Sequence, residues 1–185
     1  MIEISEETVA RVESILSGIP KGAERALSNA INRGLSRVKT GAVKRVKEVY
    51  AVQSNAFTGA ANMQINKATT SNLAGVVSFS GYKIPLYKFH VTPKVSGINK
   101  TVKAAIKKGG GTLFEDAFIA NMPYGIGVFE RETSRRFPVS EIMGLSAAQM
   151  VGNESVVQEL QQEAQELVNE RLEHEIERIL NGYGR

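Results

Sequence analysis

The feature that most constrains the fold is a long segment, residues 21–50, in which an apolar residue recurs at every third or fourth position. The recurring residues are Leu27, Ile31, Leu35, Val38, Ala42, Val46 and Val49. This spacing matches the period of an α-helix with one buried face. Pro20 suits the first turn, where its missing N–H costs little. Gly34 and Gly41 each weaken the helix by roughly 1 kcal/mol relative to alanine, and Gly41 indicates either a kink or close helix packing.

A shorter helix is predicted before it. Ser5 can cap its start, and Glu6 and Glu7 fall at the positive end of the helix dipole. Val9 and Val12 begin an apolar face, and the helix ends before the Gly18–Ile19–Pro20 break. The chain therefore opens with two helices.

In the middle of the chain the period changes from helical to alternating. Short runs of alternating or apolar residues, separated by Gly, Pro, Asn and Ser, predict strands at about 63–68, 73–80, 86–91, 101–107, 117–122 and 126–131. The last two flank the turn-like NMPYG and precede the charged run ERETSRR, which predicts a hairpin. Because the intervals are too short for helical crossovers, the sheet should be mainly antiparallel.

The helical period returns after Pro138. The segment VSEIMGLSAAQM predicts a short helix or turn, and Asn153 can cap a final helix over about 154–180. Its expected apolar face comprises Val156, Leu160, Ala164, Leu167, Leu172, Ile176 and Ile179. Its outer face carries glutamates.

Helices followed by strands and a final helix predict an α+β fold. We expect one domain over 1–185, with N-terminal helices in 1–50, a mainly antiparallel sheet of about five or six strands in 62–132, and C-terminal helices in 138–181.

Composition narrows the function. Hydrophobic residues are 42% and charged residues 23%, both ordinary for a globular chain. Cysteine is absent, which excludes disulfides and thiolate chemistry. Because the start MIEISEETV is acidic and polar, we expect no secretory signal there, and because no run of about 18 apolar residues occurs, we expect no membrane span.

No motif for catalysis, cofactor binding or metal binding stands out. Glu170 and His174 have helical spacing, but a metal site needs further ligands from elsewhere, so a solvated helix face is favoured. In Lys107–Thr112 the lysines precede the glycines, the reverse of a phosphate-binding loop. Gly125-Ile126-Gly127 lacks the third glycine of a dinucleotide fingerprint and opens a strand. We therefore predict that the chain is not an enzyme.

The charge pattern instead favours an interaction surface. The long N-terminal helix is basic and the last helix acidic, so the two can pack within one subunit or between subunits. The candidate interface residues are Arg33, Arg37, Lys44, Arg45, Lys107, Lys108, Arg131, Arg135 and Arg136. A small basic nucleic-acid-binding protein is the alternative, less favoured because no aromatic residue interleaves with the helix's charges until Tyr50.

Several segments together resemble the phage minor tail protein Z family. They are ALSNAINRGLSRVKTGAVKRVKEVY, VVSFSGYKIPLYKF, VKAAIKKGGGTLFEDAFIANMPYGIGVFERE, RRFPVSEIMGLSAAQM and RLEHEIERIL. The resemblance covers roughly Ala26 to Leu180 in the same order.

The resemblance implies a structural protein that completes the head-proximal end of a phage tail and prepares head–tail joining. It implies no catalytic residue and no cofactor. The implied partners are other tail or neck proteins. The chain could associate with itself into a ring at the tail end, and an isolated monomer is equally compatible. Nucleic acid is not favoured as a partner, and a membrane is not expected. The implied location is the host cytoplasm during assembly and then the virion tail.

Overall fold

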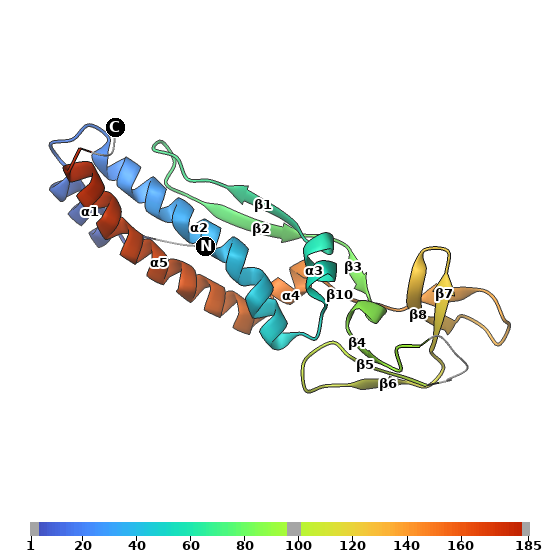
Figure 1. Ribbon diagram of the computed structural model, residues 1–185. Helices are drawn as coiled ribbons and strands as arrows, with labels where there is room; N and C mark the ends of the chain where they lie inside the picture. Colours follow the sequence, from blue (N-terminus) through green and yellow to red (C-terminus); the bar gives the residue numbers. More distant parts are fainter. Residues whose placement is uncertain (1–3, 96–100, 183–185) are drawn as a thin grey trace. The chain divides into compact units, whose positions relative to one another are not determined.

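The computed structural model describes residues 4–95 and 101–182 of the 185-residue chain. The chain divides into two compact units, each built from separate stretches of sequence (Figure 1). Unit 1 comprises residues 1–42, 63–78 and 154–185, and unit 2 comprises residues 43–62 and 79–153.

The helices bracket the strands in sequence. They are α1 (Glu6–Ile15), α2 (Gly22–Val49), α3 (Ser54–Ala60), the 3-10 helix η1 (Leu86–Lys88), α4 (Ala147–Val151) and α5 (Glu154–Leu180). The strands are β1 (Asn62–Asn66), β2 (Val76–Ser80), β3 (Lys83–Pro85), β4 (His90–Thr92), β5 (Val102–Ala105), β6 (Thr112–Phe114), β7 (Phe118–Met122), β8 (Gly125–Arg131), β9 (Val139–Glu141) and β10 (Met143–Ser146).

In the described residues these strands form four small sheets, ordered β1-β2, β10-β3, β4-β5-β6 and β7-β8-β9. Pairing is antiparallel in β10–β3 and in both three-stranded sheets. Each sheet is narrow, so helices and neighbouring strands must cover its apolar face.

Unit 1 is held together by α1, the first part of α2, and α5, which lie along one another (Figure 1). Their shared core consists of Val12, Leu16, Ala23, Ala26, Leu27, Ala30, Val168, Leu172, Ile176 and Ile179. Alanines on α2 let the helices approach closely. At Gly41 an added Cβ would lie 3.0 Å from Leu160 Cδ2 and 3.3 Å from Glu163 Oε2. The close packing expected at Gly41 is confirmed, and α2 runs through this position without a break.

The β1–β2 segment packs on another part of α2 within unit 1. Ile31, Leu35 and Ala68 form a buried cluster there. Asn32 fixes this contact in both directions: its Nδ2 donates to the Ala68 carbonyl at 3.0 Å, and its Oδ1 accepts from the Ala68 N–H at 2.9 Å. At Gly75 an added Cβ would lie 2.7 Å from Leu35, so the backbone can approach the helix only without a side chain.

Unit 2 contains the other strands and the last residues of α2. Backbone hydrogen bonds fasten the end of α2 to the residues that follow β5: Ala51 N–H donates to the Ile106 carbonyl at 2.9 Å, and Lys108 N–H donates to the Val49 carbonyl at 2.9 Å. Alternating inward residues build the core, among them Val91, Val102, Ala104, Ile119 and Val128. At α4, Ser146 and Gln149 form a capping box.

The predicted α+β class, with long helices near both ends and antiparallel strands between them, is confirmed. The single sheet of five or six strands is replaced by four small sheets. Whether the two units fold as one domain over 1–185 stays a prediction.

Three local expectations are corrected. Residues 86–88 form a 3-10 turn rather than the start of a strand, because Pro85 precedes a turn closed by Phe89 N–H donating to Leu86 at 3.0 Å. Residues 139–146 are strands β9 and β10, because they pair with β8 and β3. On α5 the buried residue is Val168, and Leu167 is half-buried beside it.

Candidate interface surfaces

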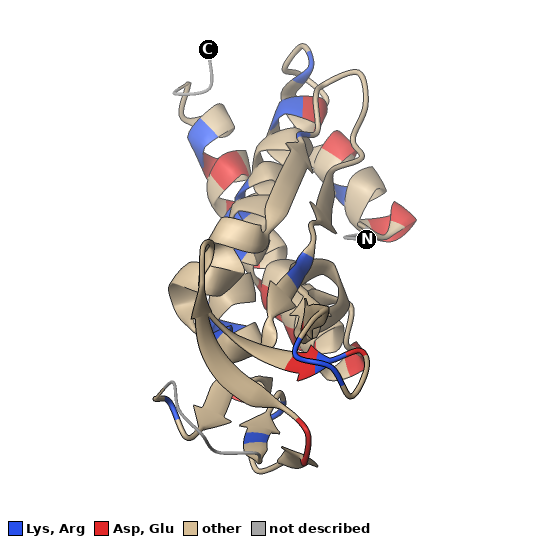
Figure 2. Cartoon of the chain, turned by 90° about the vertical axis from the view of Figure 1, so that its right-hand side faces the viewer, with Lys and Arg blue, Asp and Glu red and all other residues tan. Residues whose placement is uncertain are grey.

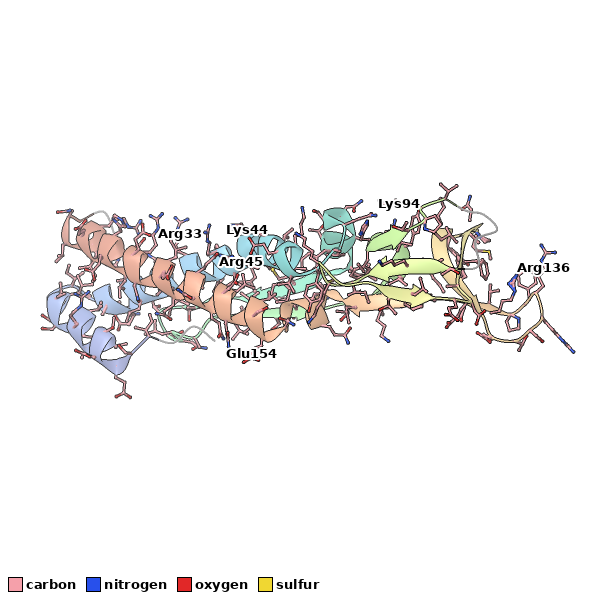
Figure 3. All side chains as sticks on the ribbon, turned by 90° about the horizontal axis from the view of Figure 1, so that it is seen from below. Arg33, Lys44, Arg45, Lys94, Arg136 and Glu154 are labelled. Atoms are coloured by element: carbon pink, nitrogen blue, oxygen red, sulfur yellow. The ribbon has the colours of Figure 1, made fainter. Side chains whose placement is uncertain are left out.

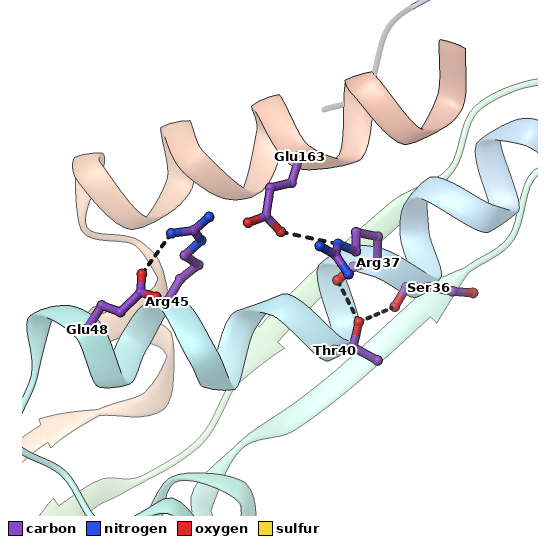
Figure 4. Close-up of polar contacts among 6 residues, drawn as sticks. All are labelled: Ser36, Arg37, Thr40, Arg45, Glu48 and Glu163. Atoms are coloured by element: carbon purple, nitrogen blue, oxygen red, sulfur yellow. Dashed lines mark hydrogen bonds and ion pairs between the residues drawn. The ribbon is translucent and has the colours of Figure 1, made fainter. Parts of the chain in front are cut away.

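Two of the candidate interface residues, Arg33 and Arg37, lie on the part of α2 that belongs to unit 1. Arg37 Nε pairs with Glu163 Oε2 of α5 at 3.3 Å (Figure 4). The Arg37 side chain is 51% exposed and that of Glu163 only 16%. Arg33 is exposed (Figure 3). The basic face of α2 is therefore partly neutralised by α5 of the same chain.

Further contacts of α5 support this conclusion. Asn29 Nδ2 donates to Glu175 Oε2 at 2.9 Å, and Arg178 pairs with the same carboxylate at 2.7 Å. Arg11 of α1 pairs with Glu173. The sequence left open whether the basic and acidic helices meet within or between subunits, and the contacts Arg37–Glu163 and Asn29–Glu175 show that they meet within the subunit.

Lys44 and Arg45 lie on the end of α2 that belongs to unit 2. Arg45 is half-buried and pairs with Glu48 at 2.8 Å, one helical turn away (Figure 4). Lys44 is exposed (Figure 3). Of these two cations, Lys44 presents the more accessible charge.

Lys107 and Lys108 follow β5 and are both exposed. The backbone of Lys107 bridges to that of Tyr50, so the two lysines lie next to the end of α2. Tyr50 itself is buried, and this burial raises the pKa of its hydroxyl, while a hydrogen bond with Asn153 partly opposes the increase. The structure thus brings Lys107 and Lys108 to the basic end of α2, which the sequence did not indicate.

Arg131, Arg135 and Arg136 lie at the end of β8 and in the connection to β9. Every residue from Glu130 to Pro138 is exposed. The Arg131 guanidinium lies over the Phe118 ring, 4.9 Å from its centroid, and that of Arg136 lies 5.5 Å from the centroid of Phe137. We call Arg131, Arg135, Arg136 and Phe137 the arginine–aromatic loop.

Exposed aromatic side chains are the surface feature that the sequence analysis missed. In the described residues they are Tyr82 and Tyr124, which are almost fully exposed, and Phe137, which is 60% exposed. All three belong to unit 2. Their sequence neighbours offered a signal, because Tyr124 follows Pro123 in the hairpin turn and Phe137 precedes Pro138.

Charge is distributed unevenly between the two units; Figure 2 marks Lys and Arg in blue and Asp and Glu in red. Counted over the sequence, unit 2 has thirteen Lys and Arg against six Asp and Glu, a formal charge of +7. Unit 1 has ten against thirteen, a formal charge of −3. The mild total of +4 therefore conceals a basic unit and an acidic one.

The remaining candidates for chemistry occupy exposed positions. His90 and His174 are both exposed. In residues 4–95 and 101–182, no three His, Asp or Glu side chains gather as a metal site.

Within the same residues, no helix is both long enough and apolar enough to cross a membrane. A groove beside Leu167 is lined by Arg37, Glu163, Glu166 and Glu170, so it belongs to the charged surface between α2 and α5.

Comparison with known proteins gives one match. A family model described as prophage minor tail protein Z (GPZ) matches residues 9–185. No curated protein and no solved structure matches the chain.

Proposed function

Because the chain belongs to the prophage minor tail protein Z family, we propose that it completes the head-proximal end of the tail and prepares that end for joining to the head. Family membership over residues 9–185 makes the chain a structural component of the phage tail rather than an enzyme. As a tail protein it contacts other tail proteins. Completion of the tail is the specific role that we propose within the tail, and it would proceed through protein–protein interfaces.

The observation that carries the proposal is the match itself, because it spans nearly all of both units. The surface supports it. Arg33, Lys44, Lys107, Lys108, Arg131, Arg135 and Arg136 form no ion pair within the described part of the chain, so their charges are available to a neighbour. Arg37 and Arg45 are already paired and would contribute less.

In this proposal the protein assembles in the host cytoplasm and remains in the virion tail. Several copies would form a closed ring at the tail end, since repeated head-to-tail contacts between identical subunits close into rings when the rotation permits. The neighbours would be tail or neck proteins.

Nucleic-acid binding is the weaker candidate. The +7 charge of unit 2 favours it. Against it, Arg45 is paired with Glu48, and Glu130 and Glu132 lie among the arginines after β8. A phosphate-driven complex with duplex DNA would lose affinity steeply as salt rises.

The test is deletion of the gene from an inducible prophage, followed by electron microscopy of the lysate. The expected result is filled heads and separate tails that fail to unite, restored to whole virions by the gene supplied in trans. Normal virions in the deletion lysate would contradict the proposal, and so would the absence of tails, which would indicate an earlier role.

A further inference from the structure

We propose that the arginine–aromatic loop is the site at which this protein docks onto a neighbouring tail protein, and that the partner surface presents carboxylates around an apolar pocket. The inference rests on the proposed function and adds the location and the chemistry of the contact. It uses residues of unit 2 alone.

The first support is exposed apolar surface. Phe137 is 60% exposed, in a chain with only seven phenylalanines. Every residue from Glu130 to Pro138 is exposed, so Phe137 adds nothing to the core of the unit. Burial of such a ring against a partner removes apolar area from water, which is the main favourable term in most protein association.

The second support is the state of the arginines. The guanidinium groups of Arg131, Arg135 and Arg136 form no ion pair with residues 4–95 or 101–182. This contrasts with Arg37 and Arg45, whose charges are taken up inside the chain. The planar fork of arginine donates two parallel hydrogen bonds to a carboxylate. Three such forks favour an acidic partner.

The third support is preorganisation. Arg131 is held over Phe118, and Phe118 in turn lies against Phe129, with 6.2 Å between the ring centroids. Arg136 is held over Phe137, and its side chain extends outward from the end of the ribbon in Figure 3. Stacking on a ring restricts a long side chain before binding, so less conformational entropy is lost on docking. Arginine and aromatic residues in one patch are also the usual composition of energetic hot spots.

The fourth support separates a protein partner from nucleic acid. Glu130 and Glu132 alternate with Arg131, and both are exposed. A phosphate backbone has no positive charge to pair with carboxylates at these positions, whereas a protein surface can present cations to them beside its own carboxylates, and mixed charge around an apolar centre suits the rim of a protein interface. The +7 charge of unit 2 then steers an acidic protein surface toward the loop.

The experiment measures binding of the purified full chain to tails taken from the lysate of the deletion prophage. Cosedimentation gives the fraction bound as a function of protein concentration. The test variants are the double substitution Arg135→Glu/Arg136→Glu and the single substitution Phe137→Ser. Because these residues are exposed, both variants should fold, and circular dichroism with thermal melting checks this.

Two matched controls come from the same unit. Lys83→Glu/Lys94→Glu makes the same change in net charge at two other exposed positions, of which Figure 3 labels Lys94. Tyr124→Ala removes an exposed aromatic residue from the other end of the same sheet. The seven residues of β8 separate the two ends by about 20 Å.

Both loop variants should weaken tail binding at least about tenfold, while the controls stay within about twofold of the unaltered chain. Equal binding by the loop variants, or equal loss in the lysine control, would overturn the docking site while leaving the proposed function intact. If duplex DNA competes with tails for the unaltered chain but does not bind the loop variants, the loop binds nucleic acid. If the loop variants lose self-association but still bind tails, the loop binds a second copy of the chain. Either result overturns the inference. If the unaltered chain does not bind tails at all, the proposed function itself fails.

Discussion

Several arginines of the two units differ in how their charge is used. In unit 1, which is acidic overall, Arg37 and Arg11 pair with glutamates of α5, and Asn29 donates to a third. In unit 2, which is basic overall, Arg131 and Arg136 stack on aromatic rings, and neither they nor Arg135 form an ion pair in residues 4–95 and 101–182. The paired arginines of unit 1 therefore use their charge within the chain, whereas the arginines after β8 in unit 2 leave theirs available to a partner. Arg33 in unit 1 and Arg45 in unit 2 depart from this contrast, because Arg33 forms no ion pair in the described residues and Arg45 pairs with Glu48.

The units also differ in exposed apolar surface. In the described residues, unit 1 exposes Ile15, Val76 and Leu180, each at or below 54%. Unit 2 exposes Tyr82, Val95, Leu113, Tyr124, Ile126, Phe137 and Met143. Because isolated exposed apolar residues are common on any protein, the contrast is informative mainly where they adjoin unpaired charges, as at Phe137.

The largest expected effect tests whether unit 1 depends on its shared helical core. Leu172→Ala removes a side chain that is 2% exposed between α5 and the other helices. The free energy of unfolding should fall by about 2–5 kcal/mol, because the substitution loses apolar burial and leaves a cavity. Urea denaturation followed by circular dichroism measures it. Leu180→Ala on the same helix, at a position 54% exposed, should change the value by less than about 0.5 kcal/mol. Equal costs at both positions would mean that α5 is not held by this core.

An intermediate effect compares the same substitution in the two units. Gly41→Leu places a side chain against Leu160 and Glu163 and should destabilise the protein by about 1–3 kcal/mol through overpacking. Gly59→Leu on α3 meets nothing within 4 Å and should be neutral or stabilise by up to about 1 kcal/mol, because leucine favours a helix more than glycine. Thermal melting of both variants measures the difference. A stable Gly41→Leu protein would show that α2 and α5 can separate there without loss.

The smallest effect concerns the ion pair that distinguishes unit 1. Glu163→Gln and Arg37→Gln, combined in a double-mutant cycle, should give a coupling of about 0.2–1 kcal/mol, since the pair is half-exposed. Added salt should reduce it. Arg135→Gln should leave the free energy of unfolding unchanged, because that guanidinium forms no ion pair in the described part of the chain. A measurable fall in the free energy of unfolding for Arg135→Gln would mean that the Arg135 charge stabilises the fold and is not reserved for a partner.

The sequence was a good guide to the helices and a weaker one to the strands. The period in α2 and α5 extends over many turns, so each repeat strengthens the prediction. Runs of three to five residues carry little information of this kind. Residues 139–141 became a strand because Arg131, Glu130 and Phe129 of β8 supply its partners, and no local signal could reveal that pairing. The change of buried residue on α5 from Leu167 to Val168 has a similar origin. Which of two adjacent residues faces the core depends on the helices packed against α5, which lie far away in the sequence.

The candidate surfaces show the same difference between what the sequence predicts and what the tertiary structure adds. The sequence by itself determined the α+β class, the two long helices, the resemblance to a phage tail family and the nine cationic candidates. Only the tertiary structure decided which of those cations are paired, because an ion pair such as Arg37–Glu163 joins residues far apart in the chain. It also decided that Phe137 has no place in a core. The periodicity of a helix can be read from consecutive residues, whereas ion pairing and the burial of a side chain depend on which distant segments of the chain meet.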